Sequence, residues 1–234
     1  MSGRLSSLSV AAASAAAACA FLGLLWIISL FAMFGITVAD TPQRVWDTAS
    51  EGNVWTWGNV LVLIVGGVLH LSRGAAAWRA RRRGALAWSA TGAALLALSL
   101  DDLAGFHEAL GSLGQRLGGG EGMLHFAWVV PGAALAAGFC LLIGLSARSM
   151  GRRPALYLLT GAGTLVAGAL GLEMLSGAYL SGGGSNVRYA LIYHAEEAVE
   201  ALGAALLLAA APADLRGETA RLGPWLTRTP PTTP

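Results

Sequence analysis

The stretch Tyr193-His194-Ala195-Glu196-Glu197-Ala198-Val199-Glu200 decides how this chain must fold. It lies inside an apolar run from about 187 to 211, so three carboxylates and an imidazole fall within about two helical turns of a segment suited to hydrocarbon. Burying an ionised carboxylate in hydrocarbon costs several kcal/mol unless something compensates the charge, so such residues inside a span mark a functional site by default. The central question is what compensates them.

The composition indicates a membrane protein. Hydrophobic residues make up 55% of the 234 residues and charged residues only 12%, whereas about a quarter of the residues in a soluble domain are charged. The net charge of +2 is too small to predict binding to nucleic acid. Cys19 and Cys140 lack any metal-binding spacing, so we expect them to be small buried hydrophobic residues.

Six apolar runs of roughly 20 residues are long enough to cross a bilayer as helices. They lie near 11–34, 55–73, 86–112, 122–146, 155–178 and 188–211. We therefore predict an all-α fold, a polytopic bundle of six transmembrane helices within residues 1–212. The apolar core of the first run is too long for a cleaved signal peptide. The proline-rich end, 213–234, is predicted to be a disordered cytoplasmic tail.

The arginines predict the orientation of these spans. Twelve of the fifteen basic residues fall in the N-terminal segment, the second and fourth loops and the C-terminal tail. Only Arg44, Arg116 and Arg188 fall on the other side. By the positive-inside rule both termini are cytoplasmic. Because every basic residue is arginine, in a chain rich in Ala, Gly and Leu, we expect a bacterial cytoplasmic membrane, that is, a bacterial inner membrane.

Two tryptophans and one cluster of arginines have simple interpretations if these runs cross a membrane. Trp55 and Trp57, at the start of the second run, are predicted to belong to an interfacial aromatic belt. The arginines between 79 and 83 are an orientation signal first and a contact for anionic lipid second. The lipid bilayer is therefore the one partner that the sequence indicates, and protein partners cannot be read from it.

The acidic residues give the sharpest prediction. No arginine lies in the middle of a predicted helix, so ion pairing cannot compensate the acids there. Seven of the thirteen acids lie within predicted helices: Asp101, Asp102, Glu108, Glu173, Glu196, Glu197 and Glu200. The predicted orientation places all of them, with His107, His125 and His194, in the outer half of the bundle. Asp101 and Glu108, seven residues apart, are expected to face the same way on one helix.

Protons, a metal ion or a water-filled cavity could compensate these acids. Imidazole together with carboxylate is the ligand mixture of Zn, Fe or Mn sites, so a divalent metal ion is our first expectation. The predicted metal ligands are His107, Glu108, His194, Glu197 and Glu200, followed by Glu173 and His125. Glu196 and Asp101 are the predicted catalytic acid–base residues. Glu173 could equally be a structural acid, and His125 an interfacial hydrogen bonder. His70 is expected to be structural.

The residue types partly resemble those of di-iron carboxylate four-helix proteins, in which glutamates and histidines from four helices hold the metal. The Glu-x-x-His motif of those proteins is absent here, and so is the His-x-x-x-His of seven-helix membrane hydrolases. The glycines, such as Gly66, Gly161 and Gly163, are expected to allow close helix packing. The sequence therefore assigns no family.

Two functions remain open. The first is a membrane metalloprotein, an enzyme that hydrolyses or oxidises a lipid or another membrane-soluble substrate. The alternative is a proton- or cation-coupled transporter that uses the intramembrane acids as a relay or substrate site. A membrane protein whose acids play only a structural role is the third possibility.

Overall fold

The structure, a computed structural model, describes residues 7–36, 41–48, 52–184 and 187–214. In these ranges the chain is all-helical and contains no strand. The long helices are α1 (Ser7–Met33), α2 (Val54–Arg79), α3 (Ala85–Ala104), α6 (Val129–Arg148), α7 (Arg152–Val166) and α9 (Val187–Ala213). The shorter ones are η1 (Gln43–Val45), α4 (Phe106–Ala109), α5 (Gly111–Arg116), η2 (Gly122–Leu124), η3 (Ala167–Leu172) and α8 (Glu173–Ser181).

Four helices are long and apolar enough to cross a membrane: Ser9–Met33, Val54–Arg79, Val129–Arg148 and Arg152–Ser181. Large apolar side chains on several helices point outward; Leu24, Leu135 and Leu156 each expose more than half of their surface. Such a surface is unfavourable in water and ordinary in lipid. The remaining long helices, α3 and α9, carry five acids between them, of which Glu196 is buried. The all-helical fold and the membrane character that the sequence predicts are thus confirmed at this coarser level.

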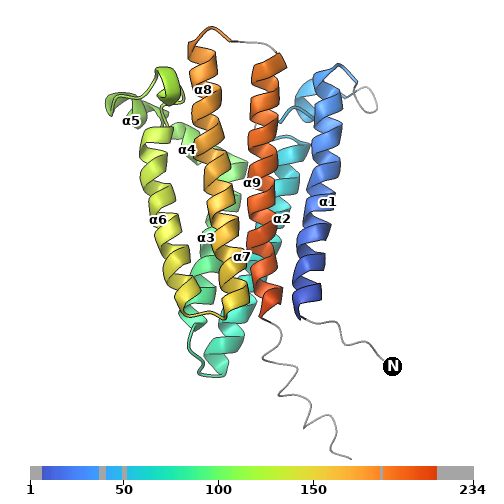
Figure 1. Cartoon of the computed structure of the whole chain (residues 1–234), viewed down its shortest axis with the longest axis vertical. Coiled ribbons are helices and arrows are strands. Elements are labelled where there is room, and N and C mark those ends of the chain that lie inside the picture. The colour runs from blue at the N-terminus through green and yellow to red at the C-terminus, as the bar shows by residue number, and fades with distance from the viewer. Residues whose placement is uncertain (1–6, 37–40, 49–51, 185–186, 215–234) are drawn as a thin grey trace, which may run out of the picture.

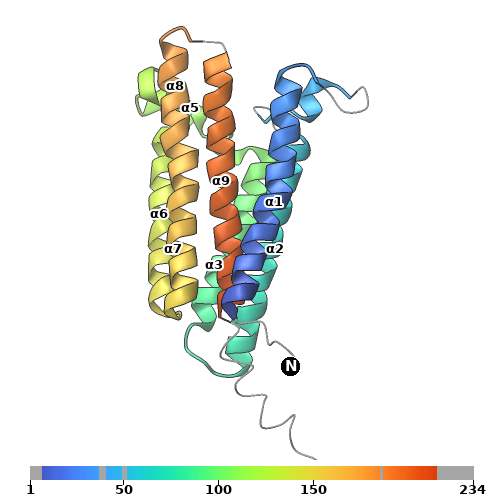
Figure 2. The same ribbon diagram turned by 45° about the vertical axis from the view of Figure 1, so that its right-hand side comes forward.

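Helix α9 lies at the centre of the bundle (Figures 1 and 2). It packs against α1, α2, α7, η3 and α8, while α3 packs against α2 and α6. The second half of α9 supplies the densest part of the core, where Ala205, Leu207, Ala209 and Ala210 are fully buried. The start of α1 and the end of α9 lie at the same end of the bundle (Figure 1).

The predicted span 86–112 is wrong as one continuous helix. Helix α3 ends at Ala104, and Gly105 follows with a φ of +61°. Its N–H donates to the carbonyl oxygen of Asp101 at 2.8 Å. A glycine in this left-handed conformation is a common helix terminator. The chain then continues as the short helix α4, so Glu108 does not share one helix with Asp101.

The predicted span 122–146 also begins too early. Helix α6 starts at Val129, and the preceding segment contains only the turn η2. Gly118, Gly120 and Gly122 all have positive φ values, which favour a turning chain over a helix. His125 therefore precedes the helix. The predicted tail, 213–234, lies outside the described residues from 215 onward.

The run predicted at 155–178 forms a continuous rod of α7, η3 and α8. Its middle, η3, has the wider π-helical hydrogen bonding. Single π turns inside α-helices frequently occur at functional sites. Here the π segment ends directly before Glu173, the one acid of this rod.

Glycines bring α7 and α9 into close contact. The prediction of close packing is confirmed for Gly161 and is wrong for Gly163. A Cβ atom at Gly203 would lie 2.6 Å from the backbone nitrogen of Leu165, and one at Gly161 would lie 2.8 Å from that of Leu207. A Cβ at Gly163 would meet nothing within 4 Å. The backbones of α7 and α9 therefore touch where Gly161 and Gly203 lie.

We expect Gly203→Ala to destabilise the bundle by about 1 to 3 kcal/mol, because the added methyl group would overlap the backbone of α7. Thermal unfolding in detergent measures the change. Gly163→Ala is the matched control on α7, and it should be neutral or slightly stabilising, since alanine favours a helix. Equal destabilisation by both changes would contradict the close contact.

Candidate carboxylate site

Six acids from α3, α8 and α9 meet in one region of the bundle. Glu200 lies within electrostatic reach of Asp101, Asp102, Glu173 and Glu197. Glu196 interacts in the same way with Glu173, Glu197 and Glu200. The carboxylate cluster, as we call it, consists of Asp101, Asp102, Glu173, Glu196, Glu197 and Glu200. The last turn of α3, the first turn of α8 and two adjacent turns of α9 position these side chains.

Two members of the carboxylate cluster bind each other directly. The side chains of Glu173 and Glu196 are hydrogen-bonded. Ionised carboxylates only accept hydrogen bonds, so this contact requires a proton on one of the two. Glu196 is also buried, with 7% of its surface exposed. The pair therefore links the first turn of α8 to α9.

Two tryptophans from other parts of the chain donate to the carboxylate cluster. The indole nitrogen of Trp55 on α2 lies 2.6 Å from Oε2 of Glu197, and that of Trp128 lies 2.9 Å from Oε1 of Glu173. Trp55 is 2% exposed, so its predicted place in an interfacial belt is wrong, whereas Trp57 is 55% exposed. Sequence reasoning missed both of these hydrogen bonds. The signal for them is that the indole N–H of a buried tryptophan needs a hydrogen-bond acceptor.

His107 lies at the margin of the carboxylate cluster. Its backbone N–H donates to Oδ1 of Asp101 at 2.9 Å, and its Nδ1 lies 3.0 Å from Oδ2 of the same carboxylate. Its ring packs edge-on against Trp128, with centroids 4.7 Å apart. The break at Gly105 makes this possible, because it turns the chain so that His107 folds back onto the end of α3.

Three other predicted ligands point elsewhere. Nδ1 of His194 is 2.9 Å from the carbonyl oxygen of Ala190, and its ring lies edge-on to Trp26 of α1. Nδ1 of His125 is 3.1 Å from Oγ of Ser181. Glu108 is exposed on α4. The structure thus gathers the acids from α3, α8 and α9 with His107 and leaves these three residues apart.

In the part of the chain that the structure describes, no three His, Cys, Asp or Glu side chains are arranged to hold one metal ion. Cys19 and Cys140 are free thiols, and Cys140 is exposed, contrary to the expected burial. The metal site therefore stays a prediction. What the described residues do present is a group of carboxyl groups within electrostatic reach of one another.

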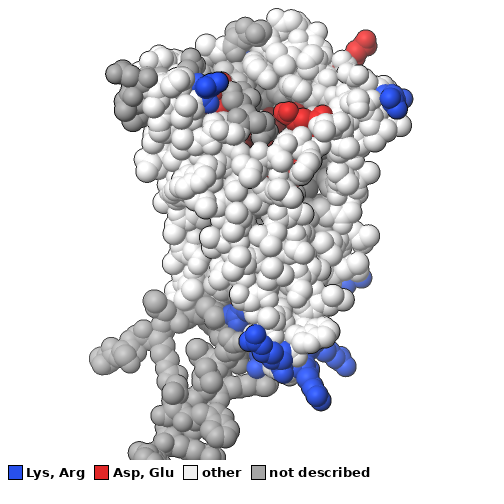
Figure 3. Space-filling view, turned by 180° about the vertical axis from the view of Figure 1, so that it is seen from behind, with Lys and Arg blue, Asp and Glu red and all other residues white. Residues whose placement is uncertain are grey.

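The π segment η3 sets the distance between the rod and α9. A Cβ atom at Gly168 would lie 2.6 Å from Cγ of Glu200 and 3.2 Å from the carbonyl oxygen of Glu196. Glycine therefore lets η3 approach the turn of α9 that carries two of the acids. Figure 3 shows acidic atoms in a hollow near one end of the molecule, opposite the end where most arginines gather.

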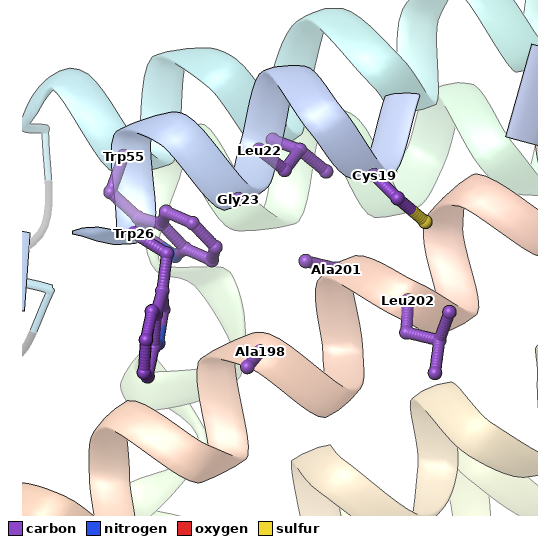
Figure 4. A pocket seen from close by; sticks show the side chains of 8 residues that line it. All are labelled: Cys19, Leu22, Gly23, Trp26, Trp55, Ala198, Ala201 and Leu202. Carbon is purple, nitrogen blue, oxygen red and sulfur yellow. The ribbon is translucent and has the colours of Figure 1, made fainter. Parts of the chain in front are cut away.

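A small apolar cavity adjoins the carboxylate cluster. It has a volume of about 200 Å³ and lies between α1, α2 and α9 (Figure 4). Cys19, Leu22 and Trp26 line it from α1, and Ala201 and Leu202 from α9. Trp55 also lines the cavity while its N–H binds Glu197. The indole of Trp55 therefore separates the apolar cavity from the carboxylates.

The fold and the site together define an all-helical bundle of membrane type with a carboxylate cluster between α3, α8 and α9. The chain belongs to the family described as Domain of unknown function (DUF8692), which matches residues 5–214. Neither a curated protein nor a solved structure matches the chain.

We expect Trp55→Phe to destabilise the protein by about 1 to 3 kcal/mol, because the Glu197 carboxylate loses a buried donor while the aromatic packing is largely kept. Thermal unfolding in detergent measures this loss. Trp57→Phe removes the same group from an exposed site and serves as the control. If the two variants unfold at the same temperature, the bond to Glu197 contributes nothing.

Proposed function

We propose that this protein is a proton- or cation-coupled membrane transporter whose carboxylate cluster binds the coupling ion. In this proposal six helices cross a bacterial cytoplasmic membrane, both termini are cytoplasmic, and the carboxylate cluster lies toward the outer side. The proposal depends on one observation: the acids from three helices lie within electrostatic reach of one another, and two of them are hydrogen-bonded to each other.

The charge of the surrounding helices supports this proposal. Helices α3 and α8 contain no arginine, and α9 contains only Arg188, in its first turn. Six ionised carboxylates cannot remain together in an apolar bundle without positive charge. Protons or a bound cation supply that charge, and both can be exchanged. Bundle-facing carboxylates are what proton- and cation-driven transporters use.

In this proposal the carboxylate cluster is reached from the arginine-poor end of the bundle. Acidic atoms are visible in the hollow near the arginine-poor end (Figure 3). Toward the other end, α9 is closed off by fully buried apolar side chains, such as Ala205, Leu207 and Ala209. In this proposal the described arrangement is the outward-facing state of an alternating-access cycle. In the second state the packing around this apolar half of α9 would open.

The metal-dependent enzyme predicted from the sequence is the second candidate, and the contact between His107 and Asp101 favours it. Histidines that bind metals commonly hold a carboxylate with their other ring nitrogen. In that case a divalent Zn, Fe or Mn ion would bind beside His107 and the glutamates, and a lipid-like molecule would be the substrate. The apolar cavity beside Trp55 suits the entry of such a molecule from the bilayer.

Proteoliposomes with a trapped pH indicator test the first proposal. When an inward gradient of protons, Na⁺ or K⁺ is imposed, the native protein should change the internal pH, and Glu200→Gln should abolish that change. Glu108→Gln removes an exposed acid outside the carboxylate cluster, so it should leave the flux unchanged. Flux that survives in Glu200→Gln, or that Glu108→Gln also abolishes, would contradict the transport role of the carboxylate cluster.

Metal analysis separates the second candidate from the first. Protein purified without chelators should contain less than one Zn, Fe or Mn per chain if the carboxylate cluster handles protons or monovalent cations. A stoichiometric metal that disappears in Glu197→Ala and His107→Ala would favour the enzyme. Loss of the metal in only one of these variants would identify the substituted residue as a metal ligand.

Gly168→Ala should lower the flux about tenfold without removing any carboxylate, because the methyl group would displace Glu200 from its position. The same proteoliposome assay measures it. Gly171→Ala is the control within the same π segment, since a Cβ atom there would meet nothing within 4 Å. Equal flux in the two variants would show that the spacing between η3 and α9 does not matter.

A further inference from the structure

A cavity of about 580 Å³ lies at the turn between α2 and α3. Its lining consists of Trp78, Arg79, Arg81, Arg82 and residues 84–86. It lies at the end of the bundle where arginine side chains gather (Figure 3), at the start of α3, whereas the acids of the carboxylate cluster on this helix lie in its last turn. Neither proposed function uses this cavity.

The turn has a defined shape. The backbone N–H of Arg82 donates to the carbonyl oxygen of Ala77 at 2.8 Å, and that of Arg81 to Trp78 at 2.9 Å. Arg81 has a φ of +51°, which few side chains adopt. Gly84, with a φ of +90°, lies against Ser149, whose carbonyl oxygen would be 3.1 Å from an added Cβ. These contacts hold the three arginines around one cavity.

The lining of the cavity is strongly positive. It contains three guanidinium groups and no acid. Among the described residues none of these three arginines forms an ion pair. Guanidinium groups bind phosphate through paired hydrogen bonds, so three arginines in the lining of one cavity match the chemistry of a phosphate group.

Apolar side chains border the same cavity. Trp78 is 74% exposed and Leu86 is 76% exposed, values that would be unfavourable for such side chains in water. Tryptophan prefers the level of the lipid headgroups at a membrane surface. A ligand that satisfies both the arginines and these apolar side chains has an anionic head and a hydrocarbon body.

We propose that the cavity at the α2–α3 turn binds the phosphate of an anionic phospholipid from the leaflet at the arginine-rich end. The three arginines hold the headgroup phosphate, and Trp78 and Leu86 contact the adjoining glycerol and acyl groups. This is a defined site, in contrast to the general attraction between basic loops and an anionic surface. It is independent of the function of the carboxylate cluster.

Lipid titration of the delipidated full-length protein in detergent tests this site. Native mass spectrometry should show phosphatidylglycerol bound more tightly than phosphatidylcholine. The double variant Arg79→Gln/Arg82→Gln should bind phosphatidylglycerol at least about tenfold more weakly, since each of the two arginines near an anionic headgroup contributes a factor of about five. Binding of phosphatidylcholine should not change.

Arg148→Gln/Arg152→Gln is the matched control, because it removes two exposed arginines at the turn between α6 and α7. It should retain the affinity for phosphatidylglycerol. Equal losses in the two double variants would overturn the proposal and leave only general electrostatic attraction. A thermal unfolding experiment with inorganic phosphate distinguishes the two sources of the phosphate group. If inorganic phosphate raises the unfolding temperature as much as phosphatidylglycerol does, the site takes free phosphate and the lipid assignment is wrong.

Discussion

The rest of the structure depends on one constraint: carboxylates inside an apolar bundle need positive charge or hydrogen-bond donors close to them. The chain meets this need in three ways. Glu173 and Glu196 share a hydrogen bond, Trp55 and Trp128 each donate an indole N–H, and the backbone of His107 donates to Asp101. Each of these contacts comes from a different segment, so the site requires the whole bundle.

Close packing places these segments at the required distances. Gly203 and Gly161 let α7 and α9 touch, and Gly168 extends that contact to the level of the carboxylates. A side chain at any of these positions would push the rod of α7, η3 and α8 away from α9. The same glycines that stabilise the bundle therefore also set the distance between Glu173 and the acids of α9.

Much of this arrangement follows from the sequence. Apolar runs of sufficient length predict the long helices, and the imbalance between acids and arginines predicts where charge must be compensated. Helix phase and depth correctly bring the acids of α9 near Glu173 and Asp101. The residue that sequence reasoning could not place is Trp55, since a tryptophan near the start of an apolar run fits an aromatic belt as well as a buried donor.

The errors have a local physical cause. The apolar run continues through Gly105, but α3 ends there because Gly105 has a positive φ. Hydropathy does not indicate a backbone conformation, so it cannot predict this helix end. The metal ligands were predicted on the assumption that His107 and Glu108 extend one helix with Asp101. After the break, Glu108 turns outward while His107 folds back. A single backbone conformation thus divides residues that are adjacent in the sequence.

The end of α3 at Ala104 has an electrostatic consequence of its own. The aligned peptide dipoles of a helix concentrate partial negative charge, about half an elementary charge, at its C-terminus. Asp101 and Asp102 lie in that last turn. The peptide backbone therefore adds partial negative charge where the two carboxyl groups already lie, and main chain and side chains together favour a positive charge beside the end of α3.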